Sequence, residues 1–161
     1  MSDPGDPTTG RARLYALASI TVATAVSQSF GRFTYSLLFT DIRDDLEISD
    51  TVTGAIGSAN LLAYLVGSLV VSMVLGRWGL AVVAQVGLVG VTAGLGLLAW
   101  GPRVSVVALG LALTGFAAAG VWVTAPALAT GLVEPGQRGR AMGVVGTGVG
   151  LGVVAASLLD I

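Results

Sequence analysis

Long runs of uncharged, mostly apolar residues alternate along this chain with short polar connections. The uncharged runs cover residues 14–31, 51–76, 78–102, 104–133 and 141–159, and the last four are 26, 25, 30 and 19 residues long. The hydrocarbon core of a bilayer is about 30 Å thick, and about 20 helical residues cross it. The pattern therefore predicts an integral membrane protein.

The pattern predicts an all-α polytopic membrane helix bundle. Residues 1–13 read as a disordered cytoplasmic tail, and residues 14–161 as a bundle of about five transmembrane helices. The predicted spans are about 14–39, 52–75, 79–100, 105–130 and 141–159. An alternative for the first span is a cleavable signal peptide, because two arginines, an apolar run and Ala23-Thr24-Ala25 fit that pattern. We favour a span, because the apolar run continues beyond Arg32 to Phe39.

Capping, turn and interfacial residues mark the ends of the inner spans. Ser49-Asp50-Thr51 supplies helix-capping side chains at the start of the second span. Residues 76–79 predict a tight turn into the third span. Trp78 and Trp100 are 22 residues apart, which corresponds to about 33 Å of helix and would place one indole ring in each headgroup layer.

Composition narrows the classes of partner and chemistry. The chain has eight arginines, no lysine and a net charge of −1, so it lacks the basic stripe that follows a nucleic-acid backbone. Cysteine and histidine are absent, and no Asp or Glu falls within a predicted span. We therefore predict no nucleic-acid partner, no metal, no cofactor and no enzymatic activity.

The distribution of arginine predicts the orientation of the chain in the membrane. Arg43 and Arg103 fall on one side of the five predicted spans. The other side carries five arginines, namely Arg11, Arg13, Arg77, Arg138 and Arg140. The positive-inside rule then predicts a multi-pass protein of the plasma membrane whose N-terminus is cytoplasmic.

Small residues predict how the helices pack, because close backbone approach has to replace hydrophobic burial within lipid. The fifth span holds Gly146 and Gly150, and also Gly148 and Gly152, at the four-residue spacing that lets two helices come close. A phosphate-binding loop is the other interpretation of such glycines. It is not favoured, because no strand precedes them and no lysine follows.

Polar residues at membrane depth are the candidate substrate contacts. Gln28, Arg32 and Tyr35 share one face of the first predicted helix. A charge near the bilayer centre costs roughly 2.5 to 3.5 kcal/mol, so Arg32 is expected to face a cavity or a partner. The alternative is that Arg32 extends its guanidinium to the headgroups at the outer end.

Further candidates lie on the second and fourth predicted helices. Asn60 and Tyr64 share a face and would line a wet cleft, unless Asn60 hydrogen-bonds a neighbouring helix. Pro126 removes one amide donor and predicts a kink in the fourth helix. Trp122 and Thr124 would then face the same cleft.

These features resemble the N-terminal half of a major facilitator superfamily transporter. The resemblance rests on the order of spans, the short turn after the second span, the Arg-Gly-Arg-Ala-Met-Gly segment at 138–143 and the glycines that follow it. Residues 30–35 (Phe-Gly-Arg-Phe-Thr-Tyr) and 58–67 are similar to the YbfB/YjiJ-type branch of predicted transporters. In the family's signature between helices two and three, this chain retains Arg77 and Gly79 but has Gly76 where an aspartate is typical.

The resemblance implies membrane transport of a small solute by alternating access. Family members have about twelve helices in two six-helix halves, with the site between the halves. Arg32 would present a positive charge to an anionic or polar substrate. With five spans, we expect a single chain to be incomplete, so its partners would be the missing transporter half or a second copy, as well as the lipid bilayer. The alternative function is a non-transporting membrane scaffold that packs on a partner.

Overall fold

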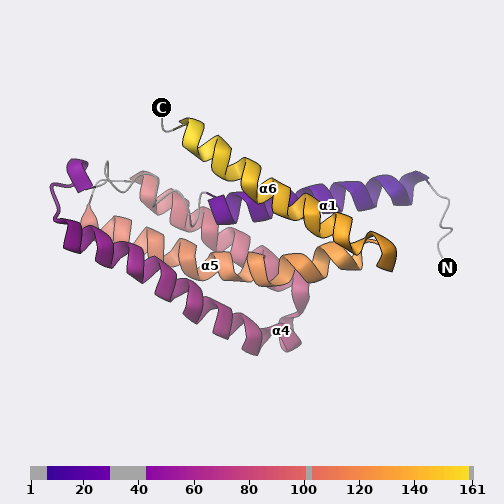
Figure 1. Ribbon diagram of the computed structural model, residues 1–161. Helices are drawn as coiled ribbons and strands as arrows, with labels where there is room; N and C mark the ends of the chain where they lie inside the picture. The colour runs from indigo at the N-terminus through magenta and orange to yellow at the C-terminus, as the bar shows by residue number, and fades with distance from the viewer. Residues whose placement is uncertain (1–6, 30–42, 101–102, 160–161) are drawn as a thin grey trace.

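The computed structural model describes residues 7–29, 43–100 and 103–159, and these residues fold as a bundle of long helices (Figure 1). Helix α1 spans Pro7–Gln28, α4 spans Asp50–Trp100, α5 spans Val104–Gly131 and α6 spans Arg138–Leu159, with a short 3-10 helix, η2, at Pro135–Gln137. No strand occurs within the described residues. The predicted all-α architecture is confirmed.

Helix α4 is a hairpin of two legs rather than one rod. It is 51 residues long, or about 77 Å at 1.5 Å per residue, which is more than twice a bilayer core. At Gly79 the backbone leaves helical geometry, with φ 77° and ψ 163°. That positive φ is accessible to glycine at little cost. The two legs, 50–78 and 80–100, then run back along each other (Figure 1).

Close backbone contacts hold both legs of α4 against α5. A Cβ atom on Gly87 would lie 2.8 Å from the Ala117 carbonyl oxygen, and one on Gly94 would lie 2.9 Å from the Gly110 carbonyl oxygen. On the first leg, Gly67 faces the Phe116 backbone in the same way. Only glycine allows these approaches, so α4 and α5 pack as the small-residue pattern of a membrane helix pair requires.

The outer faces of the helices are apolar and exposed. Met73 is 77% exposed, and Leu61, Leu62, Leu65 and Leu69 on the same leg are each more than half exposed. Among the residues that the structure describes, three helices are long and apolar enough to cross a membrane, at Asp50–Trp100, Val104–Gly131 and Pro135–Leu158. A surface of this kind is compatible with lipid rather than with water.

A polar segment before α4 closes one end of the hairpin. Ser49 caps the helix, since the Val52 amide donates to Ser49 Oγ at 3.4 Å. Arg43 forms ion pairs with Asp44 at 2.8 Å and with Asp50 at 3.1 Å. The hydrogen bond to Asp44 is the main cause of the raised pKa of the Arg43 guanidinium. Leu46 and Ile48 pack on an apolar cluster of α4 and α5, which fixes the segment to the bundle.

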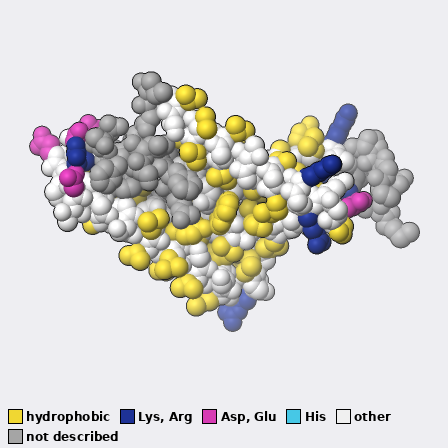
Figure 2. Space-filling model, viewed as in Figure 1, with side chains coloured by type: hydrophobic (Ala, Val, Ile, Leu, Met, Phe, Trp, Pro, Cys, Tyr) yellow, Lys and Arg dark blue, Asp and Glu magenta, His cyan; other side chains and the backbone are white. Residues whose placement is uncertain are grey.

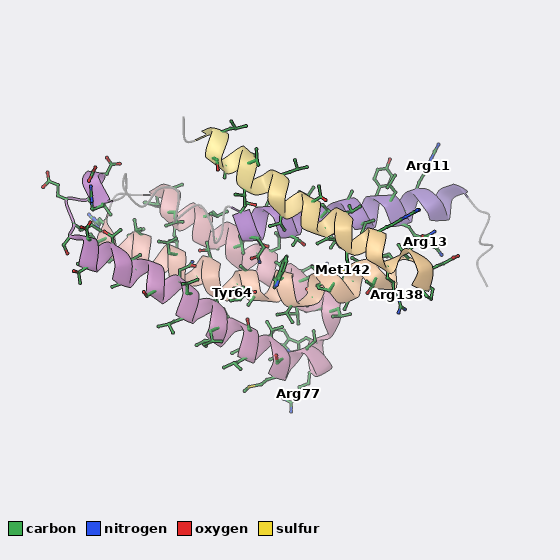
Figure 3. The ribbon with its side chains drawn as sticks, viewed as in Figure 1. Arg11, Arg13, Tyr64, Arg77, Arg138 and Met142 are labelled. Carbon is green, nitrogen blue, oxygen red and sulfur yellow. The ribbon has the colours of Figure 1, made fainter. Side chains whose placement is uncertain are left out.

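The two ends of the bundle carry opposite charge. Figure 2 shows acidic side chains gathered at the end where α4 begins and arginines at the end where α1 begins. Arg11, Arg13 and Arg138 lie at the basic end, and Arg77 lies at the turn of the hairpin (Figure 3).

One prediction about local structure was wrong. Residues 7–13, predicted within a disordered tail, belong to α1, which begins at Pro7; proline suits the first turn because a helix cannot use the amide hydrogen that proline lacks. Pro126 lies inside α5, which continues as one helix to Gly131, and the predicted kink at this position stays a prediction. Proline has no amide hydrogen, so the turn of α5 at Pro126 lacks one backbone hydrogen bond. Ala125 and Ala129, on either side of Pro126, pack on α6 and stabilise this turn.

Candidate functional site

Four buried polar residues lie close together in the sequence at the C-terminal end of α1 and directly after it. Thr24, Ser27, Gln28 and Ser29 are all at most 2% exposed. Thr24 Oγ1 donates to the Ile20 carbonyl oxygen at 2.6 Å, Ser27 Oγ donates to the Thr24 carbonyl oxygen at 3.1 Å, and Ser29 Oγ donates to the Val149 carbonyl oxygen of α6 at 3.1 Å. The hydroxyl groups are thus satisfied by backbone.

Gln28 differs from these neighbours, because its side-chain amide nitrogen is buried with no hydrogen-bond partner within the described part of the chain. A buried unsatisfied donor costs about 1–3 kcal/mol. Gln28 is fifteen residues beyond Arg13, or about 22 Å along α1; if Arg13 marks the membrane edge, that distance falls within a bilayer core of about 30 Å. An unpaired amide at that depth is a strong candidate for contact with a ligand.

A cavity of about 260 Å³ lies between α1, the second leg of α4 and α5. Its polar lining comes from Ser19, Thr24, Gln85 and Thr124, and the rest of the wall is alanine, valine, leucine and isoleucine. Thr124 Oγ1 already donates to the Gly120 carbonyl oxygen at 2.7 Å. Thr24 lies four residues before Gln28, so the cavity and Gln28 share one face of α1. Arg32 and Tyr35, the other predicted members of that face, lie outside the described residues.

Asn60 occupies a helix interface rather than a cleft. It is 2% exposed, and its side-chain amide donates to the Leu111 carbonyl oxygen of α5 at 2.6 Å. The Gly115 backbone lies against the Asn60 carbonyl group. The structure therefore supports the interpretation that Asn60 joins two helices. Tyr64, one turn later, is half-buried and packs on the cluster of Val91, Ala117 and Ala118.

Replacement of Asn60 by alanine is expected to lower stability by about 0.5–1.5 kcal/mol, the usual contribution of a hydrogen bond between membrane helices. The measurement is thermal unfolding in detergent, with Ser58→Ala as the control, since the exposed Ser58 hydroxyl bonds only to its own helix at Gly54. Unchanged stability in Asn60→Ala together with altered solute uptake would instead make Asn60 a substrate contact.

Trp122 and Thr124 do not face one cleft, contrary to the prediction. Thr124 is fully buried, whereas Trp122 is 39% exposed. Residues that are two positions apart in an α-helix point about 200° apart around its axis. Trp122 and Thr124 therefore lie on opposite faces of α5, unless the helix is broken between them. Thr124 alone reaches the cavity.

The glycines of α6 divide into two faces. A Cβ on Gly148 would overlap the Thr21 side chain of α1, and one on Gly152 would overlap Ser29 and lie 3.3 Å from the Ala25 carbonyl oxygen. Gly146 and Gly150 have no neighbour within 4 Å among the described residues. One glycine pair therefore packs inside the bundle, and the other lies on its surface.

Gln85 and Ser19 line the cavity but were not among the predicted site residues. Gln85 is polar at the middle of an apolar leg, which is a signal the sequence contained. Ser19 carried no distinguishing spacing.

Comparison with known proteins gives a family for this fold. No curated protein matches the chain. The family model described as Major Facilitator Superfamily matches residues 21–160, which includes the buried end of α1, the α4 hairpin, α5 and all of α6. The chain belongs to the Major Facilitator Superfamily, and it is a membrane protein of the transporter type.

Proposed function

We propose that the chain moves a small polar or anionic solute across the plasma membrane by alternating access, as one lobe of a secondary transporter. The observation that carries this proposal is the buried, unpartnered amide of Gln28, one helical turn beyond Thr24 in the cavity wall. Polar side chains in that setting mark substrate paths, because lipid-facing positions would not retain them. No catalytic role is proposed.

The substrate contacts in this proposal are Gln28, Arg32 and Tyr35, with Thr124 at the cavity wall. Arg32 follows Gln28 by four residues, so a continued helix places its charge one turn beyond the amide. An amide donor beside a guanidinium suits a solute with a carboxylate or another group rich in hydrogen-bond acceptors.

The distribution of arginine supports one orientation of the chain in the membrane. The end with the described arginines Arg11, Arg13 and Arg138 would be cytoplasmic by the positive-inside rule, and with it the N-terminus. Alternating access also needs a second lobe that moves against the first. We propose that this lobe, from further helices or a second copy, packs on the surface pair Gly146 and Gly150 of α6.

The finer family assignment is part of the same proposal. Residues 30–35 and 58–67 favour the YbfB/YjiJ-type branch. The loop between the legs of α4 keeps Arg77 exposed and Gly79 at the turn, so the retained signature residues occupy the hairpin.

The test of the proposal is Gln28→Leu, measured both as solute uptake and as thermal stability. Leucine removes an unsatisfied buried amide with little change of shape, so stability is expected to be unchanged or higher. In cells that express the protein together with its second lobe, uptake of small anionic and polar solutes is expected to fall at least ten-fold. The control is Gln137→Leu in the exposed η2 segment. A loss of stability with normal uptake would show that Gln28 serves the fold and would contradict the proposal.

A further inference from the structure

Another hollow lies between α1 and α6, and the transport proposal does not use it. Its volume is about 580 Å³. Arg140 stands at one end and Leu151 at the other, with Gly143, Val144 and Thr147 along α6 and Thr21 of α1 at its floor. We call it the α1/α6 groove.

Beyond Arg140 the α1/α6 groove is effectively apolar, because its two hydroxyl groups are already used. Thr147 Oγ1 donates to the Gly143 carbonyl oxygen at 2.8 Å, and Thr21 Oγ1 donates to the Leu17 carbonyl oxygen at 2.9 Å. Gly143 leaves the wall open, since a Cβ there would meet nothing within 4 Å. The groove therefore suits a hydrocarbon chain rather than a polar solute.

The mouth of the groove is cationic. Arg140 and its neighbours Arg11, Arg13 and Arg138 form no ion pair with any other described residue. Helices α1 and α6 run in the same direction from this end (Figure 1), and Thr21 meets Gly148 where they touch. Arg13 is eight residues before Thr21, and Arg140 is eight before Gly148, so both lie about 12 Å from that contact.

The length of the groove matches one leaflet of a bilayer. Arg140 and Leu151 are eleven residues apart, which corresponds to about 16 Å of helix. Half of a hydrocarbon core is about 15 Å. A ligand with its charge at Arg140 and its tail at Leu151 would therefore reach from the headgroup layer to the bilayer midplane.

We infer that the α1/α6 groove binds an anionic phospholipid, with one acyl chain along α6 and the headgroup phosphate at Arg140. A guanidinium near an anionic leaflet contributes about 1 kcal/mol to such binding, which is about five-fold in affinity. The inference is independent of the transported solute and of the role of Gln28.

The test is lipid binding to the full-length protein, counted by native mass spectrometry. Phosphatidylglycerol is compared with phosphatidylcholine of the same acyl chains, and tight binding of the anionic lipid is expected in wild-type protein. Arg140→Gln is expected to weaken phosphatidylglycerol binding about five-fold and leave phosphatidylcholine unchanged. Gly143→Leu fills the groove and is expected to abolish binding of the anionic lipid.

Two controls match these variants. Gly146→Leu is also on α6 in open space, and Arg77→Gln removes a cation from the hairpin turn; both are expected to bind lipid like the wild type. Equal losses in Gly143→Leu and Gly146→Leu, or in Arg140→Gln and Arg77→Gln, would overturn the inference. Competition by glycerol phosphate, which has no acyl chain, at concentrations near those of the lipid would also overturn it in favour of a soluble anion.

Tail placement gives a separate readout. The chain has no cysteine, so Leu151→Cys can carry a single fluorophore. Phosphatidylglycerol brominated on its acyl chains is expected to quench that fluorophore, and Gly143→Leu in the same background is expected to relieve the quenching. Quenching that persists in the filled groove would show that the tail lies elsewhere.

Discussion

Gly87→Leu is expected to destroy the packing of the α4 hairpin on α5. A Cβ at this position lies 2.8 Å from the Ala117 carbonyl oxygen, 3.0 Å from the Val121 amide nitrogen and 3.2 Å from the Gly120 Cα. All three atoms are backbone, so no side chain can rotate away and the helices have to separate. Overpacking of this kind costs about 3 kcal/mol or more.

The measurement is the fraction of protein that stays monodisperse in detergent during a thermal ramp, compared with that of Gly96→Leu. Gly96 lies on the same leg of α4, and a Cβ there would meet nothing within 4 Å. The control isolates close packing from the effects of helix propensity and added hydrophobicity. Similar stability of the two variants would show that the legs do not approach α5 through Gly87.

Arg32→Ala, introduced into a complete relative that has both lobes, is expected to abolish transport while the protein still inserts into the membrane. Arg32 lies outside the described residues, so this expectation rests on its position in the sequence. An arginine at membrane depth costs roughly 2.5 to 3.5 kcal/mol, so its removal does not hinder insertion. An anionic or polar solute would lose its charged partner.

Uptake and membrane content are measured together for Arg32→Ala, with Arg32→Lys as the comparison that keeps the charge. Partial uptake in Arg32→Lys would indicate that charge matters more than the planar geometry of the guanidinium. Normal uptake in Arg32→Ala would identify Arg32 as an anchor at the headgroups, which was the alternative interpretation of the sequence.

The architecture followed from the sequence because hydrophobic length is a direct physical signal. Apolar runs of 25 residues or more can cross a bilayer only as helices, and the family match over residues 21–160 agrees with the resemblance. The start of α1 was missed, since a Ser, Pro, Thr and Gly composition suggests disorder while local geometry at Pro7 favours a helix.

The roles of individual side chains were harder to predict, since they depend on which neighbour each residue meets. Asn60 donates to the Leu111 carbonyl oxygen, and this partner is 51 residues away in sequence. Gly148 packs on Thr21 while Gly146, two residues earlier, faces outward. Spacing showed that both glycines permit close approach, but only the placement of α1 decides which of them is used.

The single-residue turn at Gly79 limits how this lobe can move. Because only one non-helical residue joins the legs of α4, the connection between them is short. Close glycine contacts also pack both legs against α5. We therefore expect the α4 hairpin and α5 to move as one rigid body during conformational change. Any bending would then be confined to the interface at which α1 and α6 pack against the α4 hairpin and α5.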